Sequence, residues 1–227
     1  MLLLSIFVAN CGKDDDSQVD NMNINAEIES LSGQIKLLEQ PPASLELDEL
    51  TSDTLLFIFA EKRSHTLVTS IEIDLSMPGN YFPSTFPGDE QTWEALMPGN
   101  IPAGTVVDSY YLHYDNETYN DTFDINNYFN CIGQYQVNAV IKFSKPVLGI
   151  IMRAGLGEED HLGNSNNELG VASVDYCEDN LSHFPGINIV DGCQSDQFIL
   201  SEDRKTLTLK NNTDIHHDNY RVILAAD

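Results

Sequence analysis

The acidic stretch from residue 115 to residue 124 holds the densest set of side chains that could do chemistry. Asp115, Glu117, Asp121 and Asp124 lie within it, and carboxylate oxygens are the ligands that Ca²⁺ prefers. Their spacing differs from that of an EF-hand loop, and the stretch has no glycine for the sharp turn. We therefore expect either a structural Ca²⁺ site or a solvated acidic loop between two strands, and no other cofactor.

A second group of oxygen-bearing side chains is also typical of either a cation site or a solvated loop: Glu158, Glu159, Asp160, Asn164, Asn166, Asn167 and Glu168. Carboxylate pairs additionally serve glycoside hydrolysis, where two acids face each other across about 5 to 9.5 Å. The chain has 36 acidic residues, so suitable pairs arise by chance. Asp108 and Asp115, which flank residues 109–114, are not distinguished from the others. The sequence leaves enzyme activity open and leans against it.

Aromatic side chains are the candidates for ligand contacts, because exposed rings on a β-sandwich can stack on sugars. Trp93 lies in a loop-like segment between two prolines. Alternation along residues 105–114 places three side chains on one buried face: Tyr110, Leu112 and Tyr114. The same alternation turns Tyr111 and His113 outward. We expect Trp93 and Tyr111 to contact a ligand.

Three cysteines in the body of the chain bear on its redox environment. Exported proteins meet oxidising conditions, in which nearby cysteines pair. Cys177 and Cys193 are nearest in sequence, and a bridge closing a loop of about 15 residues contributes roughly 3 kcal/mol. We expect a Cys177–Cys193 disulfide with Cys131 free and buried, although spacing alone leaves the other pairings open.

The N-terminal residues resemble the signal of a bacterial lipoprotein. Residues 2–9 are apolar apart from one serine, and at about 1.5 Å per residue they cannot span a bilayer core of about 30 Å. Val8-Ala9-Asn10-Cys11 is similar to a lipobox, and Lys13-Asp14-Asp15-Asp16 resembles the export signal of Bacteroidetes-type surface lipoproteins. We expect a signal peptide over 1–10, lipid attachment at Cys11, and exposure on the outer membrane. The alternative is a secreted or periplasmic protein.

The charge of the chain excludes some partners. Acidic residues outnumber basic ones 36 to 11, which gives a formal net charge of −25. Nucleic acids and anionic lipid surfaces bind through Lys and Arg, so we expect no nucleic-acid partner and membrane contact through the lipid alone. Apolar residues make up 41% of the chain, which allows a core of ordinary size.

Short strands must position these side chains, because no long segment has a 3.6-residue period. Apolar runs between turn residues predict strands at 34–39, 54–61, 67–75, 105–114, 137–144, 147–152, 197–201, 206–210 and 220–225, with turns at 78–80 and 98–100. Residues 155–163 are expected to hold one helical turn. This pattern predicts an all-β fold, a jelly-roll-like β-sandwich with long loops and little helix. We expect an acidic flexible tether over 11–32 and a single sandwich domain over 33–227.

Several short motifs follow one another in order along residues 33–226. They include Pro41-Pro42-Ala43-Ser44-Leu45, Ser52-Asp53-Thr54, Ile71-Glu72-Ile73-Asp74, Ile101-Pro102-Ala103-Gly104-Thr105, Val106-Val107-Asp108-Ser109-Tyr110-Tyr111, Pro146-Val147-Leu148-Gly149 and Asp203-Arg204-Lys205-Thr206-Leu207. This order resembles an uncharacterised domain of secreted bacterial proteins, many of them PEP-CTERM (exosortase-sorted) proteins. The resemblance implies an exported β-sandwich and no particular catalytic residue. Many of those relatives carry a C-terminal sorting tail; we expect none here, and we expect a lipid at Cys11 to replace that anchor.

Together these features predict a lipid-anchored surface protein that acts as a non-enzymatic binding module for a glycan, the extracellular matrix or a surface protein. Two alternatives remain open. A glycan-active hydrolase requires two carboxylates that converge in a groove. A structural component of the envelope requires no soluble ligand.

Overall fold

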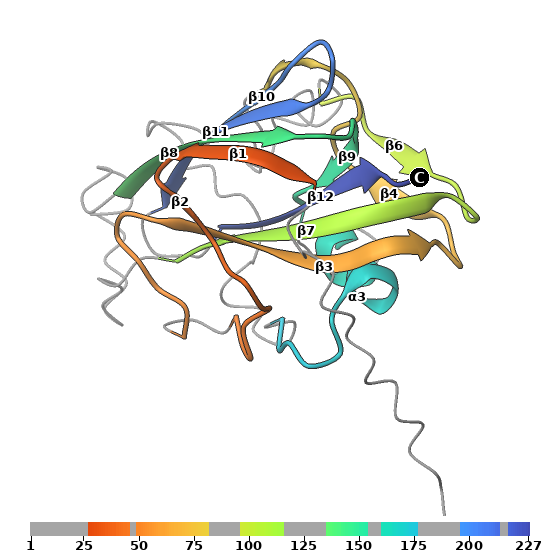
Figure 1. Ribbon diagram of the computed structural model, residues 1–227, viewed down its shortest axis with the longest axis horizontal. Helices are drawn as coiled ribbons and strands as arrows, with labels where there is room; N and C mark the ends of the chain where they lie inside the picture. The colour runs from red at the N-terminus through yellow and green to blue at the C-terminus, as the bar shows by residue number, and fades with distance from the viewer. Residues whose placement is uncertain are drawn as a thin grey trace, which may run out of the picture.

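The computed structural model describes residues 27–45, 49–81, 96–115, 135–153, 160–176, 196–213 and 218–227. These residues form two five-stranded sheets, a two-stranded sheet and one helix, α3 (His161–Leu169) (Figure 1). In order, the first sheet contains β1 (Ile28–Gly33), β8 (Tyr135–Phe143), β11 (Thr206–Thr213), β10 (Gln197–Leu200) and β5 (Gly79–Tyr81). The second contains β2 (Ile35–Leu37), β3 (Leu56–Thr66), β7 (Val106–Tyr114), β12 (Asp218–Ala225) and β9 (Val147–Ile151). The small sheet pairs β4 (Ile71–Ile73) with β6 (Gly99–Ile101). Neighbouring strands are antiparallel except β2 and β3.

The two large sheets pack face to face around one apolar core. Alternate residues of β7 and β12 point into it from the second sheet, among them Tyr110, Leu112, Tyr114, Tyr220 and Val222. Alternate residues of β8 and β11 meet them from the first sheet. Period-2 alternation therefore explains which residues are buried here. The all-β sandwich is confirmed, and the jelly-roll connectivity stays a prediction.

A third layer covers the outer face of the second sheet. It consists of α3, β4 and β6 together with the segments around Leu45 and Tyr176 (Figure 1). A second apolar cluster fills the space between this layer and the sheet, including Phe59, Ile73 and Leu162. Both faces of the second sheet are therefore buried. The first sheet covers one face and the third layer covers the other.

The strand predictions succeed where strands are apolar and fail where they are polar. All nine predicted segments contain strand residues, but β1 begins at Ile28, inside the predicted tether of 11–32. The predicted turns at 78–80 and 98–100 instead contribute to β5 and β6. Each of β1, β5 and β6 pairs along one side only, so little apolar alternation is needed to form it. Helix α3 spans His161–Leu169 and overlaps the predicted helical turn of 155–163 at residues 161–163, while residues 154–159 lie outside the described part of the chain. Among the described residues, no helix is long and apolar enough to cross a membrane.

Candidate functional site

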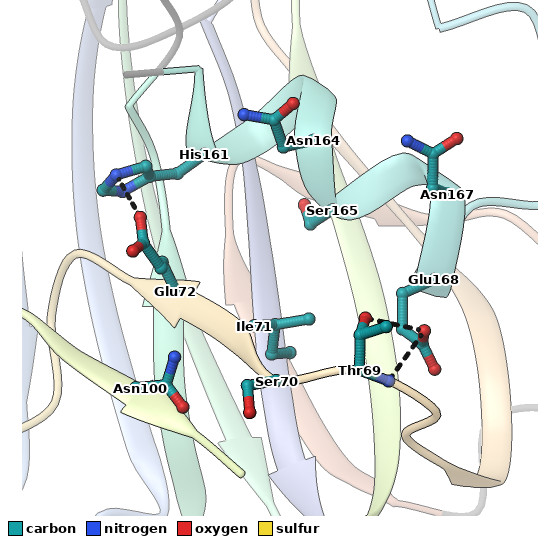
Figure 2. Close-up of a pocket in the computed structure, with 10 residues that line it drawn as sticks. All are labelled: Thr69, Ser70, Ile71, Glu72, Asn100, His161, Asn164, Ser165, Asn167 and Glu168. Atoms are coloured by element: carbon teal, nitrogen blue, oxygen red, sulfur yellow. Dashed lines mark hydrogen bonds and ion pairs between the residues drawn. The ribbon is translucent and has the colours of Figure 1, made fainter. Parts of the chain in front are cut away.

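A groove of about 520 Å³ lies between helix α3 and the small β4–β6 sheet. The lining side chains are Thr69, Ser70, Ile71, Glu72, Asn100, His161, Asn164, Ser165, Asn167 and Glu168. We call this feature the polar groove. Figure 2 shows α3 along one wall and β4 and β6 along the other. The volume is in the range of small-molecule sites, about 300–1,000 Å³.

One end of the groove is formed by Asp74, His161 and Glu72, which we call the open cluster. The buried Asp74 carboxylate accepts hydrogen bonds from the backbone N–H groups of Met152 and Arg153, both at 2.8 Å. Its Oδ1 lies 2.7 Å from His161 Nδ1, and His161 Nε2 lies 2.9 Å from Glu72 Oε2 (Figure 2). The Glu72 side chain is 62% exposed. The cluster therefore runs from the protein interior into the groove.

The position of His161 between two carboxylates favours its protonated, imidazolium form. A neutral imidazole has one donor and one acceptor, so it could donate to Asp74 or to Glu72 but not to both. The hydrogen bond to Asp74 is the main cause that raises the pKa of His161, against the opposing effect of partial burial. Nδ1 of His161 is hydrogen-bonded to Asp74 and Nε2 forms an ion pair with Glu72, and Glu72 is the member of the cluster that a ligand can reach.

The other end of the groove is closed by Glu168, whose carboxylate is fully engaged. Oε1 accepts a hydrogen bond from the Val68 N–H at 2.6 Å and lies 2.9 Å from His65 Nε2. Oε2 accepts from the Thr69 hydroxyl at 3.1 Å (Figure 2). Burial opposes the charge of Glu168, but these hydrogen bonds outweigh it and lower its pKa. Glu168 is thus an anion that ties α3 to the turn after β3.

Helix α3 is attached to the second sheet by a set of buried polar and aromatic side chains, which we call the closed cluster: Glu61, Tyr111, Ser165, Asn166, Tyr176 and Arg221. The Arg221 and Glu61 side chains are both 0% exposed, and two hydrogen bonds of 2.6 and 2.7 Å join them. The remaining guanidinium N–H groups donate to three oxygens of α3, on Leu162, Ser165 and Asn166. All five guanidinium donors are therefore satisfied, and the wall of the groove is held rigidly.

Tyr111, predicted as a ligand contact, belongs to this closed cluster. It is 1% exposed, and its ring centroid lies 5.1 Å from the guanidinium carbon of Arg221 and 5.1 Å from the ring centroid of Tyr176. The prediction that Tyr111 and His113 point outward into solvent is therefore wrong. They lie on the predicted face of β7, but the third layer covers that face and leaves no surface for a sugar.

His113 is buried in a setting that differs from that of His161. Its Nε2 lies 3.1 Å from the Leu50 carbonyl and its Nδ1 lies 2.7 Å from the Asn219 side chain. If the side-chain amide of Asn219 is flipped, so that its oxygen and nitrogen exchange places, its Nδ2 can donate to His113 Nδ1. In the present orientation Asn219 Nδ2 makes no hydrogen bond to any described residue. Burial is the main cause that lowers the pKa of His113 to about 4, so the ring is neutral near pH 7.

Most of the other predicted site residues lie outside the described part of the chain. Asp115 is described: it is 1% exposed at the end of β7, and its carbonyl accepts a hydrogen bond from the Ser52 N–H at 2.7 Å. The residues outside are Glu117, Asp121, Asp124, Trp93, Cys11, Cys131, Cys177 and Cys193. The Ca²⁺ site, the lipid attachment and the disulfide therefore stay predictions.

The second acidic group predicted from the sequence is divided among three tasks. Asp160 caps α3 by accepting from the Gly163 N–H at 2.9 Å, while Asn166 binds Arg221 and Glu168 binds the turn after β3. Glu158 and Glu159 lie outside the described residues. Within the described ranges, no three His, Cys, Asp or Glu side chains come together as a metal site.

Sequence reasoning did not find the open cluster. A signal was present in Glu72 and Asp74, because residues two apart on a strand share a face. Their partner His161 is 87 residues from Asp74 along the chain. No local pattern connects such distant residues, and only the packing of α3 against β4 brings them together.

Comparisons with known proteins do not identify a family for this chain. No protein-family model matches the chain, and neither a curated protein nor a solved structure is found to be similar to it. The resemblance to the exported domain of PEP-CTERM proteins stays a prediction.

Proposed function

We propose that this protein is a lipid-anchored, surface-exposed binding module that takes a glycan in the polar groove. The observation that carries the proposal is the groove itself, with about 520 Å³ of space lined by amide, hydroxyl and carboxylate groups. The surface location rests on the sequence of residues 1–16, which lie outside the described part of the chain.

The lining suits the hydroxyl groups of a sugar. The exposed amides of Asn100 and Asn167 each offer donors and an acceptor. Glu72 adds two acceptor oxygens that can receive neighbouring hydroxyls. Because the open and closed clusters and Glu168 fix α3 in place, little conformational entropy is lost when a ligand enters.

The alternative of a glycan hydrolase has one observation in its favour. Glu72 and Glu168 are two carboxylates that line the same groove. A glycosidase requires one of its carboxyl groups to hold a proton as the general acid. The pKa of Glu168 is lowered, and both of its oxygens already accept hydrogen bonds. Binding without hydrolysis is therefore the better supported function.

A glycan array that compares the wild type with single alanine variants tests the proposal. Asn167→Ala removes an amide from the groove, and the matched control Asn138→Ala removes an exposed amide from β8 on the first sheet. We expect Asn167→Ala to weaken binding roughly fivefold, since one neutral hydrogen bond contributes about 1 kcal/mol. The control should bind as the wild type does.

Two outcomes contradict the proposal. The first is that no glycan binds the wild-type protein. The second is that binding is lost in Trp93→Ala but retained in both Asn167→Ala and Asn100→Ala, which would move the binding surface away from the groove.

A further inference from the structure

We propose that the polar groove selects glycans that carry no acidic groups, and that Glu72 makes this selection. The inference rests on the proposed glycan function and adds the class of sugar. It follows from which charged groups can reach a ligand in the groove.

Negative charge dominates the lining of the groove. Among the described residues that line it, Glu72 and Glu168 are acidic and His161 is the one basic side chain. Arg153 does not line the groove, and its Nε lies 3.6 Å from the buried Asp74, whose charge it offsets. The whole chain has a formal net charge of −25. A carboxylated or sulfated sugar therefore approaches against a repulsive potential.

His161 does not reverse this preference, although it is a cation. Its Nδ1 is hydrogen-bonded to Asp74 at 2.7 Å, and its Nε2 forms an ion pair with Glu72 at 2.9 Å. An acidic sugar would have to displace Glu72 from His161 and would then lie beside the displaced carboxylate. Among the residues that line the groove there is no Lys or Arg to receive the anion instead.

Glu72 can accept hydroxyl groups for the same reason that it repels acids. His161 holds Oε2 from the interior side, while the side chain as a whole is 62% exposed. Hydrogen bonds to a carboxylate are roughly twice as strong as those between neutral groups. One side chain, positioned by a buried histidine, thus favours hydroxyls and disfavours anions.

The test is a matched glycan series in which each backbone is displayed in neutral, carboxylated and sulfated forms. The proteins are the wild type, Glu72→Gln, and the control Glu202→Gln, which removes the same charge from an exposed turn between β10 and β11. We expect the wild type and Glu202→Gln to prefer the neutral form about tenfold, and Glu72→Gln to lose most of that preference. Raising the ionic strength to about 1 M, where the screening length is about 3 Å, should narrow the wild-type preference as well.

Each other outcome overturns part of the argument. If the wild type prefers the acidic forms and Asn167→Ala weakens their binding, the proposed selectivity is wrong. The groove would then still be a glycan site. If Glu72→Gln and Glu202→Gln show the same preference for neutral glycans, Glu72 does not make the selection. Absence of binding to every form would remove the proposed function, and this inference with it. Equal melting temperatures of the two variants exclude misfolding as the cause.

Discussion

Two polar clusters attach helix α3 to the rest of the molecule, and they differ in how much solvent they meet. In the closed cluster the ion-paired side chains of Glu61 and Arg221 are both 0% exposed. In the open cluster the exposed fraction rises from 0% at Asp74 through 11% at His161 to 62% at Glu72. Both clusters join α3 to strands that are distant in sequence.

The difference separates a structural ion pair from a binding group. Every donor of Arg221 is used inside the protein, so the closed cluster has nothing to offer a ligand. The open cluster has the same kind of carboxylate–cation pairing at its buried end, but its outermost ion pair involves an exposed carboxylate in a groove. Both clusters contain charged groups, so charge alone does not identify a binding site. The exposure of one charged group to solvent in a groove does.

Breaking the closed cluster should have the largest effect on stability. Arg221→Met leaves Glu61 buried without its cation, and loss of one partner of a buried ion pair costs about 3–5 kcal/mol. Urea unfolding followed by circular dichroism measures this loss. The double variant Glu61→Gln with Arg221→Met should recover part of it, because no uncompensated charge remains. A loss below about 1 kcal/mol in the single variant would mean that the closed cluster does not hold α3.

The pH dependence of stability should separate His161 from His113. The pKa of His113 is lowered to about 4. The contribution of His113 to the free energy of unfolding is therefore complete above about pH 6.5 and is lost as pH falls toward 4. The full contribution is roughly 3 kcal/mol. The pKa of His161 is raised. Its contribution is therefore complete below about pH 6.5 and is lost as pH rises through the folded-state pKa.

Unfolding measured from pH 4 to pH 9 checks both signs. His113→Gln should remove the acid-side slope, and His161→Gln should remove the slope on the alkaline side. If His161→Gln leaves the alkaline side unchanged, the open cluster does not contain an imidazolium.

The sequence predicted the sandwich well because its strands obey a local rule. Alternation in β7 identified Tyr110, Leu112 and Tyr114 as one buried face, and they do point into the inter-sheet core. The alternation rule could not show that the opposite face is also buried. Tyr111 on that face is covered by Tyr176 and by residues of α3, which are distant in sequence. Helix α3 itself has only two apolar residues on its buried face, Leu162 and Leu169, so its period was not visible.

The candidate site was harder to predict because its parts are joined by packing. Glu72 and Asp74 are close in sequence, but His161 reaches them only through the position of α3. The acidic stretch of residues 115–124 was conspicuous for the opposite reason, because all the ligands predicted there are neighbours in sequence. The high local density of charge made residues 115–124 the predicted site. The groove instead combines residues from β4, β6 and α3, which are distant in sequence.

Removing the buried end of the open cluster should have an intermediate effect. Asp74→Asn places an amide N–H where a carboxylate accepted from two backbone N–H groups and His161. Leaving such a donor unsatisfied costs about 1–3 kcal/mol, and the pKa of His161 should fall. An NMR titration of the His161 ring measures that shift. Asp227→Asn, at a position that is 92% exposed, is the charge-matched control and should change neither quantity.

Removing the exposed end of the open cluster should have the smallest effect on stability. The amide oxygen of Glu72→Gln can still accept from His161 Nε2–H, and an exposed substitution typically changes stability by less than about 0.5 kcal/mol. The pKa of His161 should fall less than in Asp74→Asn, because Asp74 is the main cause of its rise. Urea unfolding and the same NMR titration measure both changes. If Glu72→Gln destabilises the protein as much as Asp74→Asn, Glu72 is a structural residue, and the open cluster no longer differs in kind from the closed one.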